Sequence, residues 1–176
     1  MRRITGAVIF SLLLWPGAVA WAQEEAPAIC PAGAPAAPPA EYASWTSRPA
    51  LASAAKAGDL AKAEIAPGKA VTARLHPTKE VVFVTQPEKP GGSVSRGGML
   101  SLKIDQAGTY RVGIGSGAWL DVLKEGKVLD SASHNPGPAC TGIRKAVDFA
   151  LQPGRYVVQI SANPADDLGV IVVRRP

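Results

Sequence analysis

Two histidines and a few carboxylates are the residues of this chain that could bind a metal. Non-haem iron oxygenases hold their metal with two histidines and one carboxylate and leave the other positions open. Here His76 and His134 would both have to bind, with Glu80 or Asp130 as the third ligand. Both histidines lie near prolines in predicted turns, which are typically exposed to solvent. We therefore expect no resident cofactor and keep His76 and His134 only as weak metal candidates.

Nucleophilic catalysis has little support in the sequence. The chain has no Gly-x-Ser-x-Gly motif, and nothing near Ser131, Ser133 and His134 would orient a base. The glycine-rich segment 90–98 lacks the lysine and the following helix of a phosphate-binding loop, and we interpret it as a flexible loop. Enzymatic activity stays open, but the sequence favours a protein without it.

The cysteines, Cys30 and Cys140, are the other reactive pair. In an oxidising compartment, two cysteines most simply form one disulfide. The bond would close a loop of about 110 residues and contribute up to roughly 4–5 kcal/mol in the chain-entropy model. It would also fasten a proline-rich segment to the folded domain. Free thiols and an intermolecular disulfide are the alternatives.

The first 22 residues predict export into such a compartment. Arg2 and Arg3 precede the apolar run 4–14, and small residues follow at the spacing that a signal peptidase needs, with cleavage before Gln23 or after Ala20. The run is too short for a bilayer core of about 30 Å, so an uncleaved anchor is the lesser alternative. We expect a periplasmic or secreted protein of a Gram-negative bacterium, with no stable membrane span after cleavage.

The composition adds limits on partners and domains. The chain has 19 basic and 14 acidic residues, but the basic residues are scattered, which argues against nucleic acid. Proline and alanine dominate residues 24–40, which are typical of an extended linker. We predict a signal peptide over residues 1–22, a Pro/Ala-rich arm over 23–44 and one folded domain over 45–176.

Hydrophobic periodicity from residue 65 onward predicts antiparallel strands. Short apolar runs alternate with turn residues about every 8–12 positions. The expected strands are 71–75, 81–85, 99–104, 109–114, 118–123, 127–129, 144–151, 155–161 and 168–174. The continuous apolar run 81–85 suits burial on both faces. We predict an all-β, antiparallel, jelly-roll-like β-sandwich of about eight strands; a barrel stays open, as does the structure of residues 41–64.

Two similar segments predict structural tyrosines. Residues 106–114 and 152–160 both contain Gly-x-Tyr after a short turn, ending at Tyr110 and Tyr156. In a tyrosine corner the ring packs inward and its hydroxyl bonds to the nearby backbone. We assign both tyrosines this structural role.

These segments carry a resemblance to known proteins. With Ile65-Ala66-Pro67-Gly68 at its start and Leu151-Gln152-Pro153-Gly154-Arg155-Tyr156 near its end, the region 65–174 resembles bacterial pre-peptidase C-terminal domains, which implies a jelly-roll-like sandwich. The acidic loops of that family are missing, so calcium binding is not implied. The patterns around 118–122 and 138–145 are also similar to short exported alphaproteobacterial proteins of uncharacterised function. Some of those carry an automated label of homogentisate 1,2-dioxygenase, a longer cytosolic iron enzyme whose motifs are absent here.

A binding surface is the remaining functional hypothesis. If Ala118, Leu120 and Val122 face the core, Trp119 and Asp121 point outward. The side chains of Arg111, Arg155 and Gln159 also occupy outward positions and complete the candidate surface. Alternatively, Trp119 faces inward or is covered by the N-terminal arm; the loop 131–142 is a second candidate surface.

Together these observations predict an exported β-sandwich module, non-enzymatic, that binds a protein or glycan of the cell envelope. The alternatives are a metal-dependent enzyme such as a dioxygenase and a purely structural envelope protein.

Overall fold

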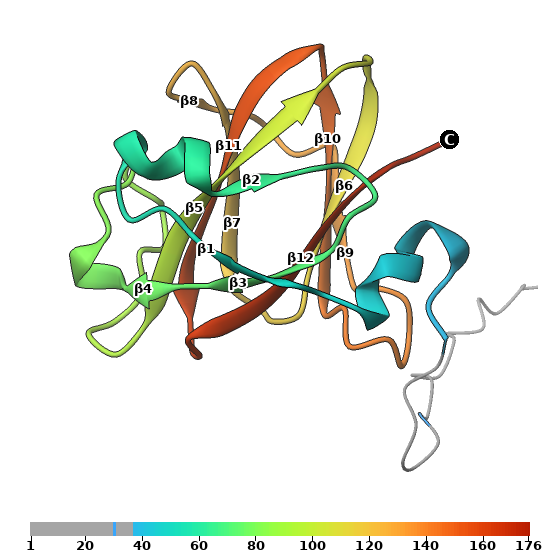
Figure 1. Ribbon diagram of the computed structural model, residues 1–176, viewed down its shortest axis with the longest axis horizontal. Coiled ribbons are helices and arrows are strands. Elements are labelled where there is room, and N and C mark those ends of the chain that lie inside the picture. Colours follow the sequence, from blue (N-terminus) through green and yellow to red (C-terminus); the bar gives the residue numbers. More distant parts are fainter. Residues whose placement is uncertain (1–29, 31–36) are drawn as a thin grey trace, which may run out of the picture.

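The computed structural model describes residue 30 and residues 37–176. The predicted signal peptide and most of the predicted arm lie outside the described residues. No helix within the described part of the chain is long and apolar enough to cross a membrane. Two β-sheets, one behind the other in Figure 1, enclose the hydrophobic core.

Each sheet is built around long antiparallel strands. In order across the sheet, sheet A contains β1 (Ala50–Ala52), β3 (Val71–Arg74), β12 (Asp167–Arg174), β6 (Gly108–Ile114), β10 (Lys145–Leu151) and β9 (Ser133–Asn135). Sheet B contains β2 (Glu64–Ile65), β5 (Arg96–Ile104), β11 (Gly154–Asn163), β7 (Trp119–Lys124) and β8 (Lys127–Val128), while β4 (His76–Pro77) pairs with β5. Three 3-10 helices complete the fold: η1 (Ala40–Thr46), η2 (Ala57–Lys62) and η3 (Thr78–Glu80).

The strand order is that of a jelly roll. If β3, β5, β6, β7, β8, β10, β11 and β12 are counted from one to eight, sheet A runs one-eight-three-six and sheet B runs two-seven-four-five. Every neighbouring pair among these eight strands is antiparallel. The short strands β1 and β2 add parallel pairs at the two sheet edges. The predicted antiparallel jelly-roll-like sandwich of about eight strands is confirmed.

Alternation along the strands produces one central core. Leu120 and Val122 of β7, and Ala118 just before it, face the opposite sheet and are buried. The strand β12 is buried on both faces, because Val170 and Val172 join the central core while its other face is covered.

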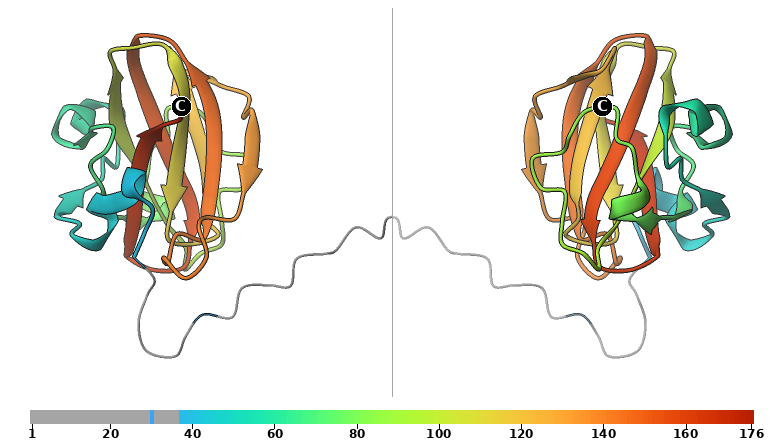
Figure 2. Two further views of the ribbon diagram at one scale, coloured as in Figure 1. Left: turned by 90° about the vertical axis from the view of Figure 1, so that its right-hand side faces the viewer. Right: turned by 90° about the vertical axis from the view of Figure 1, so that its left-hand side faces the viewer.

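The helix η1 covers that other face of β12 and accounts for part of the stretch 41–64, which the sequence left open. Tyr42 and Trp45 of η1 pack on Ile171 and Val173 and form a second small core outside sheet A (Figure 2). A Cβ atom at Gly169 would lie 2.7 Å from the Trp45 ring, so the strand needs glycine at this position.

The two tyrosines fasten the turns before β6 and β11. Tyr110 donates its hydroxyl hydrogen to the carbonyl of Gln106 at 2.9 Å, and Tyr156 donates to the carbonyl of Gln152 at 2.7 Å. Both rings are buried in the central core.

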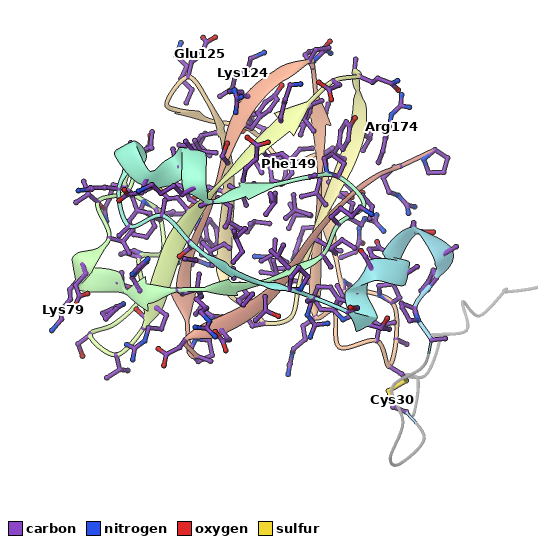
Figure 3. The ribbon with its side chains drawn as sticks, in the orientation of Figure 1. Cys30, Lys79, Lys124, Glu125, Phe149 and Arg174 are labelled. Carbon is purple, nitrogen blue, oxygen red and sulfur yellow. A yellow bond between two sulfur atoms is a disulfide. The ribbon has the colours of Figure 1, made fainter. Side chains whose placement is uncertain are left out.

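A disulfide joins Cys30 to Cys140, as predicted (Figure 3). Cys140 lies in the loop between β9 and β10, so the bond fastens the chain upstream of η1 to this loop.

The expected strand over residues 81–85 is wrong. These residues belong to the segment 81–95, which crosses the outer face of sheet B without pairing as a strand (Figure 2). Val82 is 70% exposed, whereas Phe83 is partly buried against the core. Gln159 supplies the hydrogen bonds that a neighbouring strand would otherwise give to Val84 and Thr85.

Candidate ligand-binding cleft

A cleft of about 640 Å³ opens where the edges of the two sheets face each other. One wall comes from β7 and β8 of sheet B, and the other from β9 and β10 of sheet A. The apolar floor consists of Leu120, Leu129, Val147 and Phe149. Figure 3 shows Phe149 between the two sheets. Much of the remaining lining is charged, with the carboxylates of Glu88, Asp121 and Asp130 beside Lys89 and Lys145. A concave site with an apolar floor and converging polar groups is the usual form of a binding site.

Trp119 stands at the rim of this cleft. It is the first residue of β7 and points away from the central core together with Asp121, because alternate strand residues share a face. The indole Nε1 donates to Asp121 Oδ1 at 3.0 Å. This bond fixes the orientation of the ring.

Two lysines approach the ring of Trp119. The Nζ atom of Lys89 lies 4.7 Å from the ring centroid, and that of Lys145 lies 5.4 Å away. Both distances fall within the range of cation–π interactions. Lys145 also donates to the carbonyl of Ala118 at 3.1 Å. Among the described residues, neither lysine forms an ion pair with a carboxylate.

Burial shifts the titration of the charged groups in the cleft. Burial raises the pKa of Asp121, while the hydrogen bond from Trp119 and the charge of Lys145 oppose this rise. Burial also lowers the pKa of Lys145, and the positive charge of Lys89 lowers it further. Perturbed groups of this kind in a cleft are candidates for a functional site.

The structure does not assemble the predicted surface as one patch. Trp119 and Asp121 lie together on sheet B, but Arg111 lies on β6 of sheet A, where it pairs with Asp148. The two Arg111–Asp148 hydrogen bonds measure 2.6 and 2.7 Å, and they lower the pKa of Asp148.

The other two predicted residues of this surface are also engaged elsewhere. Arg155 is exposed, pairs with Glu64 at 3.1 Å and lines a different groove beside η2. Gln159 neighbours Asp121 in the sheet but is only 1% exposed, because the segment 81–95 covers it. Neither side chain reaches the cleft.

The residue found over Trp119 does not come from the described part of the N-terminal arm, which the sequence analysis considered as a possible cover. Lys89, which belongs to the segment 81–95, lies over the ring. This segment is held near Trp119 by Ser161, whose hydroxyl donates to the carbonyl of Lys89 at 2.7 Å. The described part of the N-terminal arm packs instead on sheet A through η1.

The two histidines lie at different edges of the sandwich. His76 is on β4 beside β5, with its Nε2 atom 2.8 Å from the carbonyl oxygen of Ser53. His134 is exposed on β9 at the edge of sheet A, where it lines the cleft. Among the described residues, no three histidine, cysteine or acidic side chains come together as a set of metal ligands.

Lys89 and Lys145 are the site residues that sequence reasoning missed. Lys145 begins β10, and only the pairing of whole strands places that end beside Trp119. The predicted loop 131–142 does contribute, through Ser131 and His134.

No family model matches the chain, and no curated protein matches it. A search of solved structures finds the pre-peptidase C-terminal domain of a collagenase from Bacillus anthracis, with a TM-score of 0.39 and 14% sequence identity. The match covers 71% of this chain and 97% of that domain. This is a weak likeness to the domain type that the sequence resembles, so the cleft is interpreted from its own geometry.

Proposed function

We propose that this protein is an exported, non-enzymatic binding module of the cell envelope, and that the cleft at Trp119 holds its partner, a protein or a glycan. The observation that carries the proposal is an open cleft with an apolar floor and a charged rim, where Trp119 lies beside two lysines that form no ion pair within the described residues. Aromatic anchors beside unpaired polar groups are typical of the centre of a binding interface.

The charges at the rim support binding over a purely structural role. Asp121 and Lys145 both stay partly buried, although burial disfavours their ionised forms. Such groups lower the stability of a fold unless they are fully paired. A partner that bonded to them would recover part of this cost on binding.

The test compares the partners that immobilised variants retain. The wild-type protein, Trp119→Ala and Arg155→Ala are exposed to periplasmic extract and to glycan arrays. Arg155 is the matched control because it is an exposed residue of sheet B that lies outside the cleft. Loss of a central aromatic anchor costs about 2 kcal/mol, or about thirtyfold in affinity.

We expect wild type and Arg155→Ala to retain the same partner and Trp119→Ala to lose it, with all three proteins unfolding cooperatively. The proposal fails if nothing is retained above background, or if Trp119→Ala binds as well as wild type.

A further inference from the structure

The strand β7 has one fully paired edge and one edge that is paired only near its end. On one side, β11 pairs with residues from Trp119 to Leu123. On the other side, β8 pairs only with Leu123 and Lys124, and one further bond runs from the amide of Leu129 to the carbonyl of Val122 at 2.9 Å. The first half of this second edge therefore has no neighbouring strand among the described residues.

The backbone of Leu120 faces this open edge. In a strand, the N–H and C=O of one residue point to the same side, and every second residue shares that side. Since the carbonyl of Val122 points toward β8, the amide and carbonyl of Leu120 point the same way, into the cleft that Leu120 lines. Two residues earlier, the carbonyl of Ala118 on this side accepts a hydrogen bond from Lys145. Backbone groups at a sheet edge form a ready template for another strand.

We propose that the cleft binds an extended peptide, which adds to β7 as a further strand in line with β8 and carries an acidic side chain between Lys89 and Lys145. This inference rests on the proposed function and deepens it by naming the class of partner. In strand addition, main-chain hydrogen bonds supply affinity and alternate side chains supply specificity.

The geometry of β7 fixes how the peptide side chains point. On β7, Leu120 faces inward, whereas Trp119 and Asp121 face outward. An added strand repeats this alternation, so one set of its side chains meets the apolar floor at Val147 and Phe149. The other set lies on the face of Trp119, where Lys89 and Lys145 form no ion pair with any carboxylate that the structure describes.

The same contacts favour a peptide over a glycan. A sugar ring that stacked on Trp119 would have to displace the ammonium groups of Lys89 and Lys145 from the ring. An acidic side chain instead uses these ammonium groups. The backbone groups of Leu120 also match the spacing of a peptide strand, about 4.8 Å away.

The first experiment is an amide-resolved NMR titration of the full chain with short end-blocked peptides at millimolar concentration. The probe alternates valine and glutamate; one comparator replaces glutamate with glutamine, and another carries N-methyl groups on alternate amides. We expect the probe to shift the Leu120 amide resonance and to slow its hydrogen exchange. The glutamine peptide should bind about fivefold more weakly, as for a half-exposed ion pair. The N-methylated peptide should not bind in the register that directs its N-methyl groups toward Leu120, because it then has no amide hydrogen to donate there.

The second experiment tests the lysine with a matched control. Lys145→Gln should reduce the preference for glutamate over glutamine, while Lys124→Gln should leave it unchanged. Lys124 is on the same strand as Trp119 and also lies over an aromatic ring, with its Nζ atom 5.5 Å from the centroid of Tyr156, but it does not line the cleft.

Two outcomes overturn the inference. One is that the probe does not bind, or binds without protecting the Leu120 amide. The other is a glycan whose binding requires Trp119 while the peptide has no effect, and that result would leave the proposed function intact.

Discussion

Replacing Gln159 with leucine tests how the segment 81–95 is held against the outer face of sheet B. Gln159 Oε1 accepts hydrogen bonds from the amides of Val84 at 2.8 Å and Thr85 at 3.2 Å, and its Nε2 donates to the carbonyl of Thr85 at 2.9 Å. The side chain is only 1% exposed. Leucine has a similar size, so the substitution removes three hydrogen bonds and leaves little cavity.

The expected effect follows from the groups left without partners. A buried backbone group without its hydrogen bond costs about 1–3 kcal/mol. The segment can avoid the full cost of three such groups by lifting toward solvent, so we expect the free energy of unfolding to fall by about 2–3 kcal/mol. Local opening should also speed hydrogen exchange at the amides of Val84 and Thr85 by about thirtyfold, the equivalent of about 2 kcal/mol.

Urea unfolding and amide hydrogen exchange measure the two effects separately. Gln152→Leu is the matched control, because Gln152 is exposed and only its backbone is used in the turn before β11. Unchanged exchange at Val84 and Thr85 in Gln159→Leu, with a loss of stability no larger than in Gln152→Leu, would refute the reasoning.

Two further predictions concern the disulfide and the ion pair on sheet A. Reducing the bond between Cys30 and Cys140 should lower the free energy of unfolding by about 3 kcal/mol, because the unfolded chain gains the entropy of an open loop; urea unfolding with and without reductant measures this, and equal stabilities would contradict it. Asp148→Asn should destabilise the protein by about 2 kcal/mol at neutral pH, because it breaks the paired hydrogen bonds with Arg111. Since the folded pKa of Asp148 lies below its unfolded value of about 3.9, the stability gap to wild type should be full above about pH 5 and close as the pH falls through the folded pKa; a gap independent of pH would contradict this.

Local patterns predicted the eight main strands of the sandwich and the structural tyrosines because these features depend on neighbouring residues. Period-2 alternation gave the buried faces, and the Gly-x-Tyr segments gave the two tyrosines whose hydroxyls bond four residues upstream. The disulfide was also predictable, since the chain has two cysteines and the expected export would place them in an oxidising compartment, where they most simply form one bond.

The composition of the site was harder to predict because a jelly roll sends most consecutive strands to opposite sheets. The strand β6 belongs to sheet A and β7 to sheet B, so Arg111 and Trp119 lie on different layers although both point outward. Strand alternation gives the face of a side chain within its own sheet. It does not give the sheet to which the strand belongs.

The error at residues 81–85 arises because a local sequence pattern does not show which other strands already occupy the positions in a sheet. A continuous apolar run favours a buried strand, but β5, β11 and β7 already form adjacent positions of sheet B. The segment crosses over this sheet instead and bonds to the side chains of Gln159 and Ser161. This crossing buries Gln159 and brings Lys89 over Trp119, so one misassigned segment accounts for two errors at the site.

The partly buried charges on the outer face of sheet A are paired, whereas those in the cleft are not fully paired. On sheet A, Arg111 and Asp148 satisfy each other, and the pair stabilises the fold above the acid range. In the cleft, burial raises the pKa of Asp121 on β7 of sheet B and lowers that of Lys145 on β10 of sheet A, so the folded state disfavours both charges at neutral pH. That cost disappears only when Asp121 is protonated in acid or when Lys145 loses its proton in base. At neutral pH, the peptide proposed above would reduce the cost of keeping Lys145 charged by bringing an acidic group to it.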